Sequence, residues 1–117
     1  MITKSRKAKG RALQNLVVEK VLSSFPSLEK DDVKGAIMGE RGVDIKLSPK
    51  AKKVFPFNVE CKNQERFKNV YDCFAQADQN GNGEPIVVLK MNRRKPVVVL
   101  DCDFFFSLIQ EKDTKYG

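Results

Sequence analysis

The sequence contains no histidine and only three cysteines in its 117 residues. Cys61, Cys73 and Cys102 show no C-x-x-C spacing, so a zinc site built from cysteine and histidine is not expected. An odd number of thiols also argues against a disulfide framework. Without histidine, neither a Ser-His-Asp nor a Cys-His mechanism is available. Any acid–base chemistry must therefore use Asp, Glu, Lys, Tyr or a metal-bound water.

Long apolar stretches are missing as well. The apolar runs are far too short to cross a bilayer, and no signal peptide opens the chain, since Leu16 to Val18 is its first apolar cluster. We therefore expect a cytoplasmic protein with no membrane partner. A length near the commonest domain size and 41% hydrophobic residues suit a single core. We predict one domain over residues 1–117, with a flexible basic arm over about residues 1–7 and a frayed tail over about residues 111–117.

Positive charge is present in excess. The formal net charge is +7, and lysine and arginine gather in three clusters, within residues 4–11, 46–53 and 90–95. Basic clusters attract polyanions and bind phosphates with release of counterions. Nucleic acid is therefore the leading class of partner. The alternative is that the surface lysines mainly keep the protein soluble.

Hydrophobic periodicity predicts a mixed α/β domain. Helices are expected over residues 8–24 and 66–79, the second with a buried stripe of Phe67, Val70, Tyr71 and Phe74. Asp101 is expected to cap a last helix that ends near Ile109, with Phe104, Phe105 and Leu108 pointing inward. Strands are expected over residues 43–47, 57–62, 85–91 and 96–100, with a further short strand near 36–38 and a helical turn at 50–54. The valine-rich last two strands are expected to be covered on both faces. This order indicates a mixed central sheet flanked by helices.

Two of these strands carry polar residues with related chemistry. Asp44 lies in the first, and Glu60 and Lys62 lie two residues apart in the second, so they point to one face. Two carboxylates and an ammonium that converge on a sheet face suit a divalent cation and a phosphate. The alternative is a half-exposed strand on which Glu60 and Lys62 are only solvated.

These residue types fit the needs of phosphodiester cleavage. Asp44, Glu60 and the main-chain carbonyl of Cys61 could supply oxygen ligands to Mg²⁺. The ion would acidify a water and polarise the phosphate. Lys62 could hold the attacking water and oppose the charge that grows on the phosphate oxygens.

The segment Gly42-Val43-Asp44, a linker and then Glu60-Cys61-Lys62 resemble the signature of PD-(D/E)xK nucleases. In that superfamily an Asp and an E-x-K lie on adjacent strands of an α-β-β-β-α-β core. Val43 stands where the signature has Pro, a departure common in the superfamily. In size and basic N-terminus the chain is most similar to archaeal-type Holliday junction resolvases and small phage endonucleases.

The resemblance covers roughly residues 4–106 in architecture and carries several expectations. It implies a restriction-endonuclease-like fold and the roles just given for Asp44, Glu60 and Lys62. It implies Mg²⁺ as cofactor, with Mn²⁺ as a substitute, and no organic cofactor. The host would be a bacterial, archaeal or phage-infected cell.

Gln14 occupies a position on the first helix where the resolvase branch usually carries a Glu, about four residues after Lys9-Gly10. An inward amide could reach a metal-bound water, but it brings no charge, which puts a second metal site in doubt. Glu40 is a better substitute acid from a loop than Glu19, and its alternative is an ordinary exposed loop residue. Gln14 and Glu40 are therefore both candidate catalytic residues.

Further polar residues are candidates for contact with DNA. The basic start of the chain would track a DNA backbone, or serve only as a solubilising tail. Gln76 lies on the helix after E-x-K, where family members often have a Gln near the active site, or is simply solvated. Asn63 and Gln64 could contact phosphate or cap a loop, and Arg41 could bind phosphate or pair with Glu40. The predicted DNA-binding residues are Lys4, Arg6, Lys7, Lys9, Arg11, Arg41, Asn63, Gln64 and Gln76.

The sequence thus predicts a metal-dependent DNA endonuclease, with a Holliday junction resolvase or branched-DNA nuclease as the leading interpretation. Symmetric nicking of a four-way junction predicts a homodimer with two-fold symmetry, for which residues 104–106 could supply part of the interface or belong to the core. The alternatives are a general or nick/linear-DNA endonuclease and a catalytically inactive basic DNA-binding module. Gln14 favours the inactive module, whereas intact Asp44, Glu60 and Lys62 argue against it. RNA as the substrate is not excluded.

Overall fold

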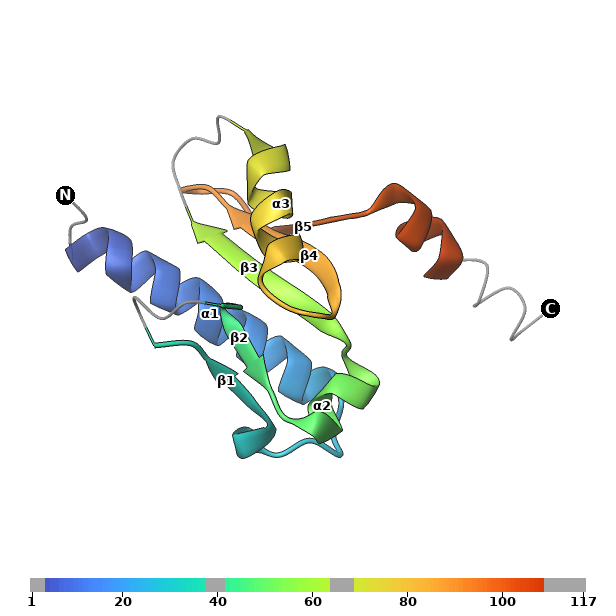
Figure 1. Cartoon of the computed structure of the whole chain (residues 1–117). Helices are drawn as coiled ribbons and strands as arrows, with labels where there is room; N and C mark the ends of the chain where they lie inside the picture. Colours follow the sequence, from blue (N-terminus) through green and yellow to red (C-terminus); the bar gives the residue numbers. More distant parts are fainter. Residues whose placement is uncertain (1–3, 38–41, 64–68, 109–117) are drawn as a thin grey trace.

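The structure, a computed structural model, describes residues 4–37, 42–63 and 69–108. Figure 1 shows its elements, which follow in order: α1 (Lys4–Ser24), the 3₁₀ helix η1 (Lys30–Asp32), β1 (Val33–Gly35), β2 (Ile45–Leu47), α2 (Pro49–Val54), β3 (Phe57–Asn63), α3 (Val70–Gln79), β4 (Glu84–Lys90) and β5 (Val97–Leu100). Residues 102–108 are also helical. The described helices include none that is long and apolar enough to cross a membrane.

The strands form a two-stranded and a three-stranded sheet. β1 and β2 pair antiparallel, whereas β3 pairs parallel with β4, and β4 pairs antiparallel with β5. α3 supplies the crossover that two parallel neighbours require. The Asp44 N–H, just before β2, donates to the carbonyl of Val59 in β3 at 3.1 Å, which joins the edges of the two sheets. The predicted α/β class, with a mixed sheet flanked by helices, is confirmed.

Helices cover both faces of the three-stranded sheet. Leu13, Val17 and Val21 of α1 are buried in one cluster with Val59 of β3 and with the same face of β4. Val87 points to the opposite face of β4 by alternation, and it is buried, as is Ala77 of α3. α3 packs against β3 and β4 (Figure 1). Side chains on either face of β3 are therefore withdrawn from water.

The first helix is longer than predicted. It begins at Lys4, so the prediction of a flexible arm is wrong for residues 4–7. Lysine, arginine and alanine have high helix propensities, which lets the helix extend through this basic stretch. The short first strand lies at Val33–Gly35 rather than near residues 36–38, and β2 begins only at Ile45, so that Asp44 precedes the strand.

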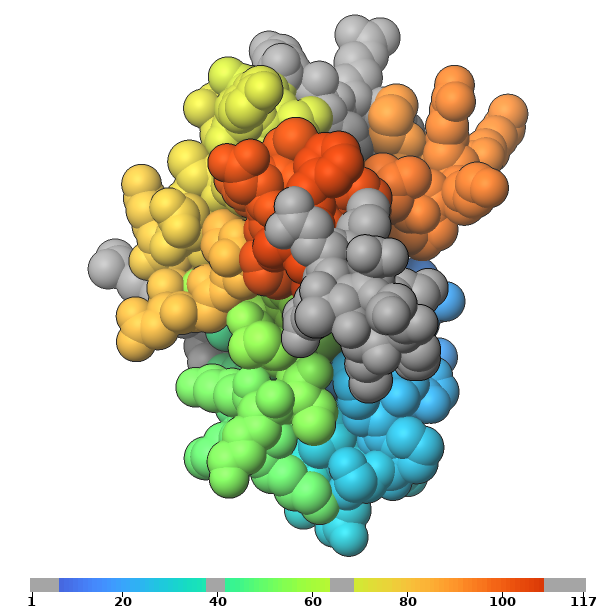
Figure 2. Space-filling model, turned by 90° about the vertical axis from the view of Figure 1, so that its right-hand side faces the viewer, coloured from blue at the N-terminus to red at the C-terminus, as the bar shows by residue number. Residues whose placement is uncertain are grey.

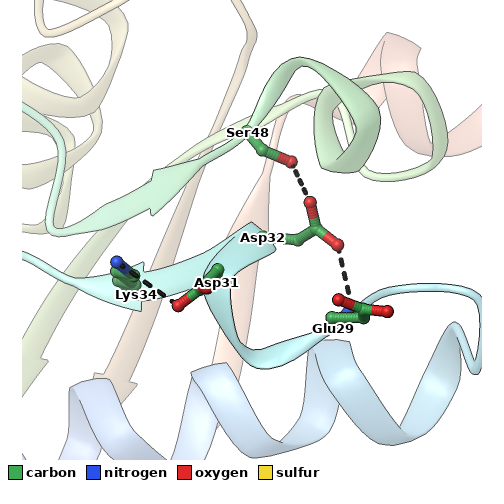
Figure 3. Close-up of polar contacts among 5 residues, drawn as sticks. All are labelled: Glu29, Asp31, Asp32, Lys34 and Ser48. Carbon is green, nitrogen blue, oxygen red and sulfur yellow. Dashed lines mark hydrogen bonds and ion pairs between the residues drawn. The ribbon is translucent and has the colours of Figure 1, made fainter.

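A polar junction holds the start of α2 (Figure 3). Ser48 caps the helix, since its Oγ accepts a hydrogen bond from the Ala51 N–H at 3.0 Å. The same hydroxyl donates to Asp32 Oδ1 at 2.6 Å, and Asp32 Oδ2 accepts from the Glu29 N–H at 2.8 Å. The Ser48 hydroxyl, followed by the Glu29 N–H, lowers the pKa of Asp32. These bonds fix η1 against α2 at the end of the β1–β2 pair.

Two predictions of burial are wrong. Tyr71, placed on the buried stripe of α3, is 85% exposed. β5 is not covered on both faces, because Val97 and Val98 are each about half exposed, at 52% and 53%. β5 is the outer strand of its sheet, and α3 packs on β3 and β4 instead.

The last helix is capped as predicted, but it is less buried than predicted. Asp101 Oδ2 accepts a hydrogen bond from the Phe104 N–H at 2.9 Å. The Phe104 ring lies edge-on to Phe57, with 5.6 Å between ring centroids. Phe105 and Leu108, which were expected to point inward, are 45% and 41% exposed. The helix is thus attached through Phe104, and Phe105 and Leu108 remain partly exposed.

Gly83 supports the start of β3 by close contact. A Cβ at this position would lie 2.9 Å from the main-chain oxygen of Pro56 and 3.0 Å from Asn58 Oδ1. The Gly83 N–H also donates to that Asn58 oxygen at 3.0 Å. We expect Gly83→Ala to lower the free energy of unfolding by about 1–3 kcal/mol, measured by urea denaturation.

Gly10→Ala is the matched control for this substitution. A Cβ at Gly10, within α1, meets nothing within 4 Å. Alanine should therefore raise the free energy of unfolding by about 0.5–1 kcal/mol through helix propensity. Equal stability of Gly83→Ala and the unsubstituted protein would show that the contact at Pro56 relaxes without cost.

Candidate active site

Asp44 is fixed beside the middle of β3. Gly42, with a φ of 106° that favours glycine, precedes it in the approach to β2. The Asp44 N–H donates to the Val59 carbonyl at 3.1 Å, and Asp44 Oδ2 accepts from the Cys61 N–H at 2.8 Å. The two contacts on β3 come from the residues on either side of Glu60. The Asp44 carboxylate is therefore held next to Glu60 by main-chain groups.

Glu60 and Lys62 share a face, as the strand alternation predicted. Their side chains form an ion pair, with 3.1 Å between Lys62 Nζ and Glu60 Oε1. The two side chains are only 4% and 22% exposed, respectively. A pair of charges with so little access to water incurs a large desolvation cost. The alternative of a solvated polar strand is therefore wrong.

The two carboxyl groups influence each other directly. The two side chains lie close enough for the charge of Asp44 to act on Glu60. Burial raises the pKa of both groups, and the charge of Asp44 raises the pKa of Glu60 further. The Cys61 N–H and the Lys62 ammonium lower the pKa of Asp44 and so oppose the effect of burial. The pair thus concentrates negative charge that Lys62 only partly neutralises.

Cys61 contributes through its main chain. Burial, followed by the charges of Asp44 and Glu60, raises the pKa of its thiol to about 12, which excludes a thiolate nucleophile at neutral pH. Its N–H points to Asp44. Because the N–H and C=O of a strand residue project to the same side, its carbonyl also faces the edge where Asp44 lies.

The donor set has the chemistry of a site for a hard divalent cation. Within residues 4–37, 42–63 and 69–108, no group of three or more His, Cys, Asp or Glu side chains could hold a metal ion. Mg²⁺ usually retains several waters and takes one or two carboxylates from the protein. The buried carboxyl group of Glu60 and the half-buried one of Asp44, which repel each other when ionised, fit that requirement, with the carbonyl of Cys61 on the same edge.

Gln14 lies inward on α1, as predicted, and is 8% exposed. Its amide packs against β1, since a Cβ at Gly35 would lie 3.0 Å from Gln14 Oε1. The next residue along β1, Ala36, donates its N–H to the carbonyl of Asp44 at 2.7 Å. Gln14 is thus one strand away from Asp44, and no hydrogen bond to Asp44 or Glu60 is found among the described residues.

The other predicted residues divide into three groups. Glu40, Arg41 and Gln64 lie outside the described residues, as do the side chains of Lys4 and Arg6. Gln76 is exposed on α3, as are Lys7 and Arg11 on α1, and the structure gives none of them a contact with the Asp44–Glu60 pair. Asn63 and Lys9 are in contact, because Asn63 Nδ2 donates to the Lys9 carbonyl at 3.2 Å.

Comparison with family models, with curated proteins and with solved structures finds no match. The chemistry of the site must therefore be inferred from its own residues.

One part of the site's surroundings could not be placed from the sequence. The parallel register sets Lys62 opposite Leu89 and Asn63 opposite Lys90, so the basic turn between β4 and β5 follows directly beyond the end of β3. Lys9 Nζ donates to Asn92 Oδ1 in this turn at 3.0 Å. Charge identified the cluster at residues 90–95, but only the pairing of β3 with β4 could bring it near Glu60 and Lys62.

Proposed function

We propose that this protein is a metal-dependent endonuclease that hydrolyses phosphodiester bonds in DNA. The observation that carries the proposal is the constellation of Asp44, Glu60 and Lys62, in which the buried Glu60 forms a 3.1 Å ion pair with Lys62 beside the half-buried Asp44. Burial of such a set is costly, and perturbed carboxyl groups of this kind occur most often at functional sites. The +7 net charge suits a polyanionic substrate.

The order of elements supports a PD-(D/E)xK nuclease in particular. Helix α1, strands β1, β2 and β3, helix α3 and strand β4 follow in the sequence α-β-β-β-α-β, with the short α2 inserted before β3. Asp44 immediately precedes the second strand, and Glu60-Cys61-Lys62 lies on the third. A restriction-endonuclease-like core is therefore part of this proposal.

The residues would divide the chemistry among them. Asp44, Glu60 and the Cys61 carbonyl would hold Mg²⁺, or Mn²⁺ as a substitute, which when bound supplies a Lewis acid and lowers the pKa of a water. Lys62, held by Glu60, would orient the attacking water and neutralise charge on the phosphate. The Cys61 N–H keeps the Asp44 carboxylate oriented. No organic cofactor is required.

Branched DNA, above all the four-way junction, is the substrate we propose. Its resolution needs paired nicks and hence a homodimer with two active sites related by a two-fold axis. Phe105 and Phe106 are 45% and 54% exposed, so neither is a core residue of the described chain. The inactive DNA-binding module is the second candidate, because the buried amide of Gln14 brings no charge to the site.

The proposal is tested by cleavage of an end-labelled four-way junction and of its matched linear duplex, each with Mg²⁺ and with chelator. We expect metal-dependent cuts confined to the junction, in symmetric pairs within the lifetime of one complex. Equal cutting of both substrates would indicate a general endonuclease instead. Tight binding without cutting, with Mn²⁺ as well, would leave the inactive binding module.

A further inference from the structure

The turn between β4 and β5 carries three adjacent positive charges. Arg93, Arg94 and Lys95 are consecutive and exposed. Of the ion pairs found among the described residues, none involves these three side chains. Figure 2 shows the long side chains of this orange segment standing out from the body of the molecule. The turn is therefore a compact group of three cations that are available to a partner.

The turn keeps its shape without using these three side chains. Lys90 Nζ donates to the carbonyls of Met91 and Arg94 at 3.1 and 3.0 Å. The Arg94 N–H donates to the Met91 carbonyl at 3.1 Å. A preformed turn loses little conformational freedom when a ligand binds, which favours affinity.

Arg93 has an unusual backbone conformation. Its φ is 63°, in the left-handed region that glycine or asparagine occupies more readily. A long cationic side chain at such a position costs backbone energy that glycine would avoid. Backbone strain of this kind clusters at active sites and ligand-binding segments.

The turn is tied to the strand that bears the candidate catalytic residues. Asn92 accepts a hydrogen bond from Lys9, and the Lys9 carbonyl accepts one from Asn63 at the end of β3. With a rise of about 3.3 Å per residue and about 4.8 Å between strands, the tip of the turn lies on the order of 10–15 Å from Lys62. One DNA strand carries a phosphate about every 3.4 Å of helix axis. The turn is therefore a few nucleotides from a phosphate at Lys62.

We infer that the β4–β5 turn is a phosphate clamp, in which Arg93, Arg94 and Lys95 bind the DNA backbone a few nucleotides from the scissile phosphate. The inference rests on the proposed function and adds a surface that the candidate DNA contacts on α1 did not include. Arginine suits the role, because its planar guanidinium binds phosphate with two hydrogen bonds. Such contacts position the substrate and carry no sequence information.

The test is the salt dependence of DNA binding by the full chain, with chelator present to prevent cleavage. The variant is Arg93→Gly/Arg94→Ala/Lys95→Ala, in which glycine accepts the positive φ. The probe is a fluorescein-labelled four-way junction, and anisotropy gives Kd at several NaCl concentrations. We expect Kd at about 100 mM salt to rise at least about tenfold, and the slope of log Kd against log salt to fall by about 2–3, since each lost phosphate contact removes up to about 0.9.

A matched control removes the same charge elsewhere. Lys20, Lys30 and Lys34 are exposed on α1, η1 and β1 and lie outside the three basic clusters of the sequence. The triple alanine variant of these lysines should keep the unsubstituted slope. Arg93→Lys/Arg94→Lys, which retains the charge, should also keep most of the slope. Thermal unfolding of each variant confirms that it is folded.

The outcomes separate the two proposals. Equal loss of slope in the turn variant and the lysine control would mean that only net charge matters, which would overturn the clamp. Junction cleavage by the unsubstituted protein, together with an unchanged slope in the turn variant, would overturn the clamp alone. Failure of the unsubstituted protein to bind DNA would overturn the proposed function and the clamp with it.

Discussion

Glu60→Gln is expected to abolish DNA cleavage, with a rate at least about 10²–10³-fold lower, while DNA binding persists. The substitution keeps the shape of the side chain but removes one of the two carboxylates and the partner of Lys62 at 3.1 Å. The cation would then be held by a weaker donor set, and the Lys62 ammonium would lose its orientation. The measurement is the single-turnover rate of junction cleavage with Mg²⁺, next to anisotropy binding with chelator.

Glu84→Gln is the matched control. Glu84 is also a strand carboxyl whose pKa is raised, first by burial and then by the charges of Asp101 and Asp78. It begins β4 opposite Phe57, at the other end of β3 from the Lys62 side chain. Its loss should leave the cleavage rate within about twofold of the unsubstituted protein. A fully active Glu60→Gln variant would remove the basis of the proposed mechanism.

The neighbouring residues should give distinct results in the same assay. Asp44→Asn should also abolish cleavage, since it removes the other carboxylate of the pair. Lys62→Ala should lower the cleavage rate and leave the carboxylate pair in place. Misfolding would not explain either result if the variants unfold at the same urea concentration as the unsubstituted protein.

The arrangement of Glu60 and Lys62 could be predicted because strand alternation alone decides it. Their burial could not be predicted from the same pattern. Asn58, Glu60 and Lys62 alternate with apolar residues in the way a solvent-facing strand does. Glu60 is nevertheless 3% exposed, since helices pack on both faces of β3. This polar strand face is buried by elements that are distant in the sequence. The residue pattern of a single strand does not predict such packing.

The errors at β5 and Tyr71 have the same origin. A run of valines predicts a strand, but whether that strand is central or outermost depends on sheet order. β5 pairs with β4 alone among the described strands, so Val97 and Val98 remain half exposed. Tyr71 is near the N-terminal end of α3, and Ala77 is the residue of that helix that is fully buried. Helical spacing predicts a face, whereas it does not reveal how much of the face is covered.

The position of Gln14 could be predicted from the sequence only in part. Its inward position was expected from the helical pattern, and its 8% exposure agrees. What its amide contacts could not be predicted. The amide packs against β1, and this close packing depends on the absence of a Cβ at Gly35. The distance from Gln14 to the carboxylates is therefore set by strand pairing that local sequence does not encode.

Stability without metal is expected to fall as the pH rises from 5 to 8. Burial raises the pKa of Asp44 and Glu60 above their ordinary values of 3.8 and 4.5. Between those values and the raised ones, the folded protein keeps protons that the unfolded chain has released, so its free energy of unfolding decreases with pH. The contribution of the pair is therefore largest below pH 4 and is lost as the pH rises through the folded pKa values.

The other perturbed carboxyl groups can be separated from this pair. Asp32 has a lowered pKa. Its contribution to the free energy of unfolding is therefore present above pH 3.8 and is lost only at lower pH, outside the range from pH 5 to pH 8. Glu84 has a raised pKa and changes stability in the same direction as the pair. The difference in free energy of unfolding between the unsubstituted protein and Glu60→Gln, followed with pH, therefore gives the pH dependence that comes from the candidate site. Glu60→Gln should be at least as stable as the unsubstituted protein at pH 8, because it removes a buried charge.

If the proposed metal site is correct, Mg²⁺ should reverse this pH dependence, because it would bind the ionised pair and relieve its repulsion. At pH 8 we expect saturating Mg²⁺, at about one hundred times its Kd, to raise the free energy of unfolding by about 2.7 kcal/mol. At pH 5, where protons compete for the carboxylates, the increase should be much smaller. The measurement is urea denaturation at both pH values, with Mg²⁺ and with chelator, for the unsubstituted protein and for Glu60→Gln. Equal stabilisation of both proteins by Mg²⁺ at pH 8 would place the bound ion away from Glu60, and the assignment of this carboxyl pair as the metal site would be wrong.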